Sequence, residues 1–439
     1  MRVLAVDAGA GSVRVVEVAL LAGRLSAKTL AAFPTPWYYD GAFERWDVAA
    51  MVGGIRDALA AAGEFYSWSV DTWGVDFGLL DEGGALLADP IRYRDPSHQV
   101  GAAELERLLS RERRYALTGI QPLVFNTASQ LMARRARGDE ELRRARRLLF
   151  LPDLLHHLVA GGDTRIERTI ASTSEMLGLD GEWQPEVVSL LGVEPLLSPL
   201  CEAGEGVPPR APGHDTAAAV VAAPGEGEGW AYISSGTWSL VGVELHAPIP
   251  TSEALAAGFT NERGVGGTFR FLKNVMGLWL LERSRGERSV EECLALAASD
   301  GQTGVRFEVN HPTLLNPADM ASAIRAIADG PLEGEGRLYR CILENLAREY
   351  AETIATIERL TGRAIEAVHV VGGGCRNRLL NSLTAAALRR RVLVGPVEAT
   401  ALGNALVQLM GIGVVGSAAE GRRLVRASFA CDQAVPEPE

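Results

Sequence analysis

The chain has 439 residues and a formal net charge of −12 at pH 7, and 47% of its residues are hydrophobic. This length suits two large domains, and this composition excludes a disordered chain. The negative charge argues against a nucleic-acid partner, because phosphate backbones attract basic surfaces.

The cysteines and the N-terminus indicate the compartment. Five cysteines are widely spaced and form no C-x-x-C pair, so we expect neither a disulfide framework nor a zinc site. The first residues lack the apolar core of a signal peptide, and no apolar run approaches the ~18 residues of a membrane span. We therefore expect a cytoplasmic protein without a membrane partner, either a monomer or a dimer.

Two short stretches predict the same hairpin. Residues 4–18 and residues 231–243 each indicate a strand, a turn that combines glycine with Ser or Thr, and a second strand. Bare backbone N–H groups and a hydroxyl in such a turn bind anions. One turn in each half predicts two related lobes that hold the phosphates of a nucleotide. The expected fold class is α/β: a two-lobed actin-like (ribonuclease-H-like) ATPase fold with mixed sheets flanked by helices.

Other elements of the first half alternate between strands and helices. Asp47 predicts the N-cap of a helix over residues 48–59, whose apolar residues recur at helical spacing. Residues 65–70 predict a strand, and a hairpin turn is expected at residues 81–84. Residues 101–157 predict a mainly helical stretch. Such alternation is typical of a mixed α/β sheet.

The second half repeats this pattern. Glycines and glutamates at residues 226–229 predict the joint between an N-terminal sugar-binding lobe, 1–228, and a C-terminal nucleotide-binding lobe, 229–439. Gly362 predicts the end of a long helix over residues 338–360. A strand is expected next, at residues 367–371.

Two carboxylates are candidates for chemistry. Asp7 follows a predicted strand just before the turn glycine, where it could hold Mg²⁺ through water or only stabilise the turn. Asp215 precedes an Ala/Val-rich helix, where it is either an N-cap or a general base. A base that accepts the proton of a substrate hydroxyl contributes roughly 10²–10⁴-fold to the rate.

Residues 71–77 and several glycines indicate ligand contacts. Asp71 and Trp73 suit a polyol, which presents both C–H and O–H surfaces; the alternative is a core Trp beside a turn. Gly373 and Gly374 predict a phosphate- or adenosine-binding turn after a strand. Gly403 indicates either close approach of the backbone to a ligand or tight helix packing. The chain has no G-x-x-x-x-G-K-[ST] motif.

Together these segments resemble the FGGY carbohydrate kinases, and the match extends over nearly the whole chain. The stretches that carry the resemblance are residues 71–77, 93–95, 125–127, 213–217, 234–240, 273–281, 372–377 and 395–399. The resemblance implies phosphorylation of L-rhamnulose at its primary hydroxyl by ATP and Mg²⁺, giving the 1-phosphate. The expected partners are therefore a small ketose and ATP.

The resemblance also implies roles for residues at matching motif positions. Asp215 is expected to be the base. The position of Asp7 at a strand end, and not the resemblance, is the ground for expecting it to hold Mg²⁺ through water. The expected sugar contacts are Gly74, His214, Thr216 and Asn274, together with Asp71 and Trp73. The expected ATP contacts are Ala10, Gly11, Ser12, Val13, Arg14, Thr237, Glu282, Gly373, Gly374 and Gly403.

The sequence departs from the family pattern in several places. Residues 207–212 contain three prolines where an apolar strand is expected, so that strand, and the base after it, could be displaced. The segment before them and the C-terminus are short. Glu282 occupies the position of an expected Gln near ATP, where an added negative charge would weaken nucleotide binding.

Three alternatives remain open. The first is a kinase for another ketose, such as L-fuculose or L-xylulose. The second, suggested by the prolines, is a catalytically weakened sugar-binding homologue. The third is a filament protein or a chaperone-type ATPase with the same fold, which needs no base for a hydroxyl.

Overall fold

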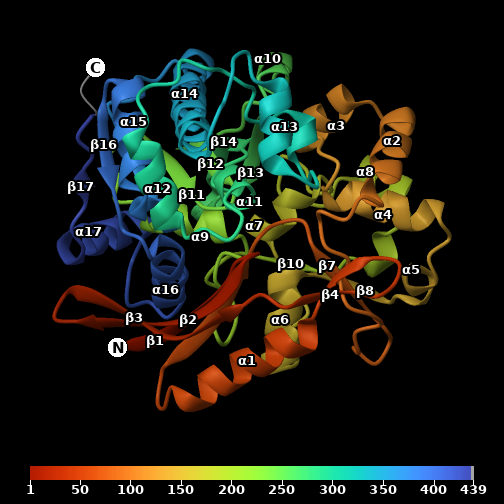
Figure 1. The fold of residues 1–439 in the computed structure, drawn as a ribbon. Coiled ribbons are helices and arrows are strands. Elements are labelled where there is room, and N and C mark those ends of the chain that lie inside the picture. The colour runs from red at the N-terminus through yellow and green to blue at the C-terminus, as the bar shows by residue number, and fades with distance from the viewer. Residues whose placement is uncertain (437–439) are drawn as a thin grey trace. The chain divides into compact units, whose positions relative to one another are not determined.

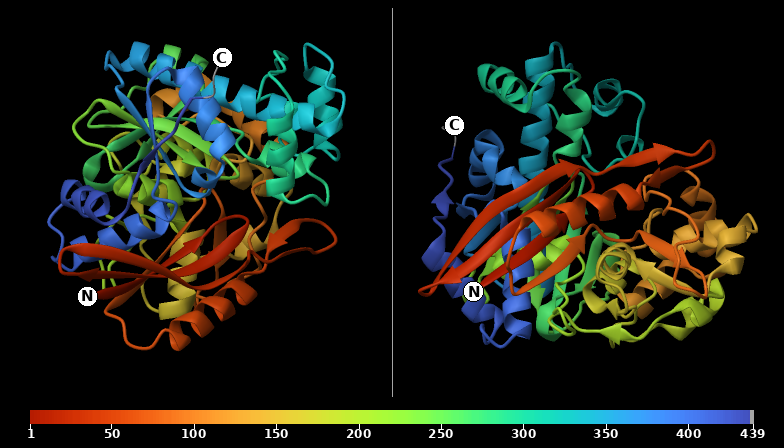
Figure 2. Two further views of the ribbon diagram at one scale, coloured as in Figure 1. Left: turned by 60° about the vertical axis from the view of Figure 1, so that its left-hand side comes forward. Right: turned by 90° about the horizontal axis from the view of Figure 1, so that it is seen from below.

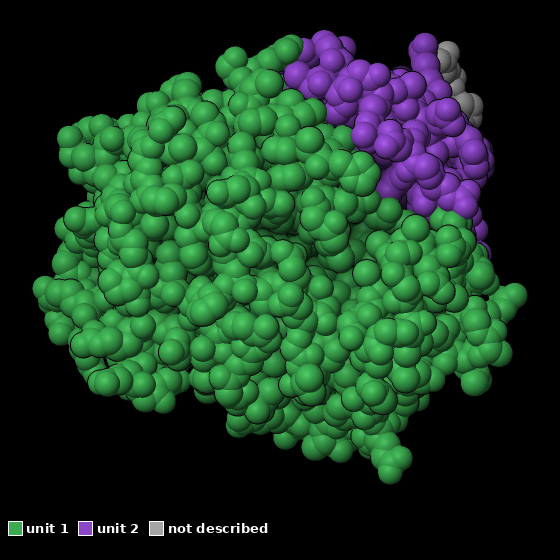
Figure 3. All heavy atoms as spheres, turned by 180° about the vertical axis from the view of Figure 1, so that it is seen from behind, with its two compact units in different colours: residues 1–222, 244–271, 400–428 green, residues 223–243, 272–399, 429–439 purple. Residues whose placement is uncertain are grey.

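A computed structural model describes residues 1–436, which form two compact units, each built from several chain segments (Figure 3). Unit 1 comprises residues 1–222, 244–271 and 400–428, and unit 2 comprises residues 223–243, 272–399 and those from 429 on. The chain first changes unit between residues 222 and 223. The division into lobes at residue 228 stays a prediction. Within residues 1–436, no helix has the length and apolarity that a membrane crossing needs.

A four-stranded sheet with the order β3–β2–β1–β6 forms the centre of unit 1 (Figure 1). β1 (Arg2–Ala8) pairs antiparallel with β2 (Ser12–Leu21), which confirms the first predicted hairpin, and parallel with β6 (Ser67–Thr72). β3 (Arg24–Pro34) forms one edge. Nearly every residue of β1 is buried, as expected for a central strand covered on both faces.

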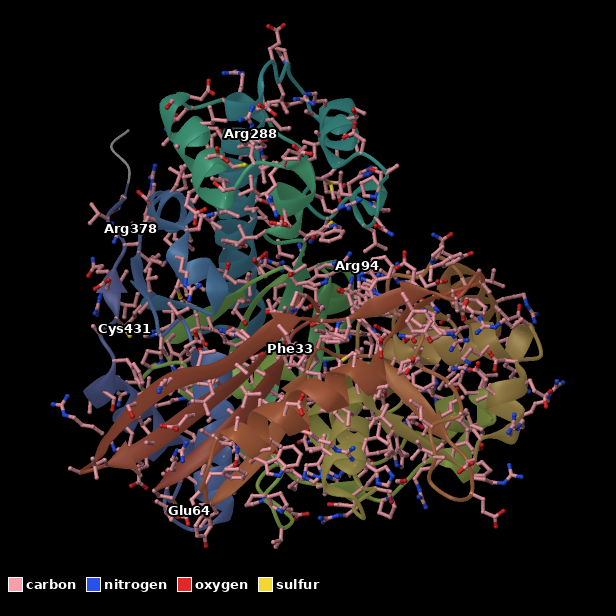
Figure 4. The ribbon with its side chains drawn as sticks, turned by 60° about the horizontal axis from the view of Figure 1, so that its bottom comes forward. Phe33, Glu64, Arg94, Arg288, Arg378 and Cys431 are labelled. Atoms are coloured by element: carbon pink, nitrogen blue, oxygen red, sulfur yellow. The ribbon has the colours of Figure 1, made fainter. Side chains whose placement is uncertain are left out.

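Helices cover both faces of this sheet (Figure 2). α1 (Val48–Ala61) contacts β2 and β3, and α6 (Leu151–Ala160) contacts β6. Asp47 caps α1 as predicted, because its carboxylate accepts from Ala50 N at 2.9 Å. Phe33 of β3, labelled in Figure 4, lies so close to α1 that a Cβ on Gly54 would be 2.6 Å from its ring. α16 (Ala399–Gly411) covers the other face, where Gln408 Nε2 donates to Leu4 O at 3.0 Å.

The prediction of a mainly helical stretch over residues 101–157 is wrong in one part. β8 (Arg147–Phe150) interrupts the helices and pairs antiparallel with β7 (Phe77–Leu80). Its apolar residues 148–150 are fully buried, and a short apolar run suits a strand as well as a helix until a partner is present. The helices of this stretch are α2 (His98–Leu108), α3 (Arg111–Thr118), α4 (Thr127–Ala136) and α5 (Glu140–Arg144), followed by α6.

Shorter elements complete unit 1. Its other strands are β4 (Trp37–Tyr39), β5 (Glu44–Trp46), β9 (Ile166–Glu167), β10 (Leu200–Cys201) and β13 (Phe259–Arg263). Its other α-helices are α7 (Arg168–Ala171), α8 (Pro185–Leu191), α9 (Asp215–Ala222), α10 (Ser252–Ala256) and α17 (Ala418–Ser428). Its 3₁₀ turns are Ser172–Ser174, Glu194–Leu196 and Val265–Gly267.

Unit 2 is built on strands in the order β14–β12–β11–β15–β16–β17. β11 (Trp230–Ser235) and β12 (Ser239–Leu245) pair antiparallel, which confirms the second predicted hairpin. β15 (Ala367–Val371) lies parallel to β11 at the predicted position. The predicted long helix is α14 (Glu335–Thr361), which ends at Gly362 with a left-handed φ of 68°.

The remaining elements of unit 2 are the outer strands of this order and the helices and turns that flank the strands. They are β14 (Phe269–Val275), β16 (Arg391–Val394), β17 (Asp432–Gln433), α11 (Trp279–Ser284), α12 (Val290–Ser299), α13 (Met320–Ile327), α15 (Arg378–Leu388) and the 3₁₀ turns Pro312–Leu314 and Gly373–Arg376. α15 packs against both α14 and β16.

Candidate functional site

Three predicted carboxylates meet in unit 1. Asp7 near the end of β1 and Asp71 near the end of β6 are paired in register. Asp215 begins α9, and this helix start is joined to β6 by a parallel bridge between Thr72 and His214. The carboxyl ends of parallel strands therefore bring together residues that are far apart in the sequence.

Asp71 is the most confined of the three. Its side chain is fully buried, Oδ2 accepts from Asn404 Nδ2 at 2.6 Å, and Oδ1 has no hydrogen-bond partner. Burial, and next the charge of Asp7, raise the pKa of Asp71 well above its usual value, and Asp215 adds to the shift. The site thus concentrates negative charge where a bound cation would relieve it.

Asp7 is paired with Arg14 across the first hairpin. Arg14 Nη2 donates to Asp7 Oδ2, and the two residues face each other in the β1–β2 register. The turn between them is fixed, because Gly9 N donates to Ser12 O at 3.0 Å and Thr35 Oγ1 donates to Gly9 O at 2.6 Å. Of the predicted phosphate-binding residues, Gly11 and Ser12 are exposed, Ala10 and Arg14 are half-buried, and Val13 is buried.

A buried ion pair supports His214. Arg270 is fully buried, and its Nη2 lies 2.9 Å from both Glu262 Oε2 and His214 Nδ1. Burial raises the pKa of Glu262, but the charge of Arg270 outweighs it and lowers that pKa below its usual value.

The ion pair also favours one tautomer of the ring. Glu262 Oε2 is 3.2 Å from His214 Nδ1, which is farther than Arg270. Because a guanidinium only donates, the shorter contact makes Nδ1 an acceptor and leaves the ring proton on Nε2. This Nε2 lies 3.4 Å from Asp215 Oδ1. Thr216, the next predicted sugar contact, is buried and donates to the same Asp215 oxygen at 3.2 Å.

The loop after β6 is held by a buried carboxylate. Asp76 Oδ2 accepts from Trp46 Nε1 at 2.7 Å and from Trp73 Nε1 at 2.8 Å. Burial raises the pKa of Asp76 to about 6, although the hydrogen bonds from both indoles lower it. Trp73 is thus a buried residue with its polar atom satisfied, which fits the alternative of a core Trp; its contact with a sugar stays a prediction.

The same loop stores backbone strain. Val75 has a left-handed φ of 70°, which is rare for a β-branched residue. Its N donates to Thr173 Oγ1 at 3.1 Å, and its O accepts from Thr127 Oγ1 at 2.7 Å. A Cβ on Gly74 would lie 3.1 Å from the Thr173 side chain, so the loop is shaped closely around residue 74.

Unit 2 contributes its own turns. Thr237 is exposed in the β11–β12 turn, and its O accepts from Trp279 N at 3.1 Å. Gly373 is exposed with open space at its Cβ position, whereas a Cβ on Gly374 would lie 1.9 Å from Ser235 Oγ. Gly373 therefore leaves its backbone accessible, while Gly374 allows the turn to pack on β11. Asn274 on β14 is half-buried, and its O accepts from Asn310 Nδ2 at 3.2 Å.

Comparison with known proteins assigns the family. The model of the N-terminal domain of the FGGY family of carbohydrate kinases matches residues 3–220, and the model of its C-terminal domain matches residues 231–412. The chain belongs to the FGGY family of carbohydrate kinases. Its relatives include the rhamnulokinase of Bacteroides thetaiotaomicron, which is 39% identical and covers 97% of this chain and 94% of its own. The rhamnulokinase of Enterococcus faecalis is 37% identical, with 97% and 92% covered.

Solved structures share the fold of this kinase. Gluconate kinase from Lactobacillus acidophilus aligns with a TM-score of 0.82 at 12% identity, over 100% of this chain and 94% of that one. Xylulose kinase from Rhodospirillum rubrum gives 0.77 at 19% identity, over 100% and 95%. The predicted actin-like α/β ATPase fold, with mixed sheets flanked by helices, is confirmed.

The structure bears on one departure from the family pattern, Glu282, and on the two alternatives for Gly403. Glu282 is bound by Arg285 through two contacts, Oε1 to Nη2 at 2.6 Å and Oε2 to Nε at 2.8 Å. The negative charge that was expected to weaken ATP binding is therefore offset by its neighbour. Gly403 of α16 packs on α9, where a Cβ would lie 1.8 Å from Ala218 O. Tight helix packing is thus confirmed for Gly403, and its approach to a nucleotide stays a prediction.

Sequence reasoning missed Asn404, Glu262 and Arg270. Asn404 is bonded to a residue 333 positions away, and the Arg270–His214 contact joins residues 56 apart. No local spacing marks these residues. An available signal was Arg270, a charged residue between apolar neighbours in β14, because a buried charge requires a partner.

Proposed function

We propose that this carbohydrate kinase transfers the γ-phosphoryl group of ATP to the primary hydroxyl of L-rhamnulose, giving L-rhamnulose 1-phosphate. The proposal is supported by relatives named rhamnulokinase that match nearly the full chain at 34–39% identity. The observation that carries the chemistry is the Asp215 carboxylate, which is 29% exposed beside a His214 that is only 8% exposed.

Asp215 accepts the proton of the acceptor hydroxyl in this mechanism. As the sugar oxygen bonds to the γ-phosphorus, the bond to the bridging oxygen of ADP breaks, and the hydroxyl proton passes to Asp215. His214 Nε2 orients the nearer Asp215 oxygen, at 3.4 Å. The proposed sugar contacts are Gly74, His214, Thr216, Asn274, Asp71 and Trp73.

ATP and Mg²⁺ are the proposed cofactors. The exposed turn around Gly11 and Ser12, with the Gly11 N–H and the Ser12 hydroxyl, suits phosphate oxygens. Ala10, Val13, Arg14, Thr237, Glu282, Gly373, Gly374 and Gly403 are the other proposed ATP contacts. The donor set fits Mg²⁺, because the Asp71 Oδ1 atom is buried without a partner in the register pair of Asp7. Asp7 would hold the ion through water, and the ion would neutralise phosphate charge.

A panel of ketoses under coupled ATP turnover tests the substrate. We expect L-rhamnulose to give the highest kcat/KM, ahead of L-fuculose and L-xylulose. The proposal fails if L-rhamnulose is among the poor substrates. Calorimetric binding of sugar without turnover would instead identify the weakened homologue, and ADP release that sugar does not stimulate would favour a filament or chaperone-type ATPase.

The role of Asp215 has its own test. Asp215→Asn keeps the size of the side chain but cannot take a proton, so we expect kcat to fall by roughly 10²–10⁴-fold while ketose binding survives. Activity close to wild type would remove Asp215 from this role. A cytoplasmic location remains a prediction from composition, and monomer and dimer both stay open.

A further inference from the structure

Residues 207–212, which lead to Asp215, do not form a strand. Residues 207–212 contain three prolines and form turns and irregular backbone. Side chains of unit 1 bind the segment instead. Ala211 N donates to Ser69 Oγ at 2.6 Å, and Arg210 Nη1 donates to Asp153 Oδ1 at 3.0 Å. Arg210 and Asp153 are both buried.

Glu167 is at the centre of this arrangement. It is 1% exposed, and its Oε2 accepts from three backbone N–H groups: Gly213 at 2.8 Å, Thr169 at 2.9 Å and Ile170 at 3.2 Å. The Thr169 hydroxyl also donates to this oxygen at 2.5 Å. The same hydroxyl accepts from His214 N at 3.3 Å.

The backbone of the two residues before Asp215 is therefore bound at three polar atoms. Gly213 N is held by Glu167, His214 N by Thr169, and Gly213 O accepts from Thr72 N at 2.8 Å. A Cβ on Gly213 would lie 2.9 Å from the Ile170 side chain, so the backbone at residue 213 also packs closely against Ile170. Rotation about this backbone would move Asp215, which follows directly.

Binding backbone N–H groups with a buried ionisable side chain costs free energy, because the charge loses its hydration. Glu167 Oε1 is buried without a partner, and a buried carboxylate costs several kcal/mol unless it is compensated. Asp153 Oδ1 accepts from Glu167 N at 3.2 Å as well as from Arg210, so the Arg210 charge is coupled to the same cluster. This cost is consistent with a role that goes beyond filling the core.

We propose that Glu167 is a positioning residue, whose carboxylate fixes the Gly213–His214 backbone, directly and through Thr169, and thereby aims Asp215 at the acceptor hydroxyl. The inference rests on the proposed function, in which Asp215 is the base. Misplacement of a reacting group by about 1 Å can cost about 10²-fold in rate. Loss of these hydrogen bonds to Glu167 should therefore lower kcat and leave the affinity for ketose and ATP nearly unchanged.

The test compares variants of the full chain in steady-state assays on the best ketose of the wild-type enzyme. We expect Glu167→Leu to lower kcat by about 10²-fold with each KM changed by less than about 3-fold. Glu167→Gln retains an acceptor oxygen and should recover at least about 10-fold of that loss. Thr169→Val, nearly isosteric, should lower kcat by about 3- to 10-fold, and it keeps the test decisive if Glu167→Leu does not fold.

A matched control is Glu175→Gln. Glu175 is also fully buried in unit 1, but its side chain is bound by Arg114 at 2.7 Å and by Asn126 at 3.4 Å. Among the described residues, none of its hydrogen bonds or ion pairs reaches residues 207–214. We expect Glu175→Gln to lower stability without changing kcat. If the kcat of Glu167→Leu equals that of Glu175→Gln, the positioning role is wrong. If Glu167→Leu does not fold, the same comparison is made with Thr169→Val.

A second readout does not depend on activity. Hydrogen exchange of the amides of Gly213 and His214 should accelerate at least about 10-fold in Thr169→Val or Glu167→Leu, and should not accelerate in Glu175→Gln. Unchanged exchange would overturn the inference about Glu167. A wild-type enzyme that phosphorylates no ketose would overturn the proposed function instead, so the two failures are distinguishable.

Discussion

Gly403 offers a direct test of the packing beneath the candidate base. It lies in α16, and its Cα approaches α9 so closely that an added Cβ would be 1.8 Å from Ala218 O and 2.5 Å from Ala218 C. Real Cβ contacts essentially never fall below 3.0 Å, so Gly403→Ala requires the two backbones to separate by about 1.2 Å, the difference between 3.0 and 1.8.

The expected cost follows from the nature of the obstacle. Overpacking a core costs about 1–3 kcal/mol, and a carbonyl within a helix cannot rotate away as a side chain can. Ala in place of Gly within a helix returns about 1 kcal/mol. We therefore expect a net loss of up to about 2 kcal/mol in the free energy of unfolding. Because Asp215 begins α9, the same shift should also lower kcat, by up to about 10²-fold.

Gly53 is the matched control, since it lies within α1 with nothing within 4 Å of its Cβ position. Gly53→Ala should gain about 0.5–1 kcal/mol from helix propensity alone. Urea unfolding of both variants, together with kcat and the KM for ATP, completes the experiment. A Gly403→Ala enzyme as stable as Gly53→Ala would refute the packing argument, and a raised KM for ATP with unchanged stability would favour the nucleotide role.

Two further outcomes follow from buried charges. The pKa of Asp76 is raised to about 6, above its usual 3.8, so the folded state binds the proton more tightly and stability should fall, by about 3 kcal/mol, as pH rises from about 4 to 6. Urea unfolding should show a fall that is steeper in wild type than in Asp76→Asn by about this amount, because the other buried carboxyls titrate in both proteins. Parallel pH curves would contradict the role of Asp76. Arg270→Met leaves Glu262 buried without its cation and should cost about 3–5 kcal/mol, whereas Arg270→Met with Glu262→Leu should recover part of that loss. A double variant less stable than Arg270→Met alone would contradict that account.

Sequence motifs predicted those elements whose structure depends on residues close together in the chain. The cap at Asp47 and the left-handed end at Gly362 each depend on one residue and its nearest neighbours. Both hairpins follow from glycine turns between apolar strands. β8 was missed because its three apolar residues fit a helix equally well, and only pairing with β7, far earlier in the chain, makes it a strand.

The candidate site was predictable in part for the same reason. Asp7, Asp71 and Asp215 each stand at the end of a strand or the start of a helix, where sequence reasoning places chemistry. The residues that bind these carboxylates carry no such local signal. Asn404 reaches Asp71 from α16, and Glu167 reaches Gly213 across 46 residues. These contacts exist only once the chain has folded, and no periodicity records them.

The prolines before Asp215 show why a departure from a family pattern need not remove a function. Proline has no N–H to give to a ladder, so residues 207–212 cannot be held as a strand. Ser69, Asp153 and Glu167 supply acceptors to this segment and to Gly213, and the backbone before the base is bound without a ladder. A ladder distributes its hydrogen bonds over many residues, and one substitution removes few of them. Here a single carboxylate oxygen of Glu167 accepts several hydrogen bonds at once. The position of Asp215 should therefore be unusually sensitive to substitution of Glu167.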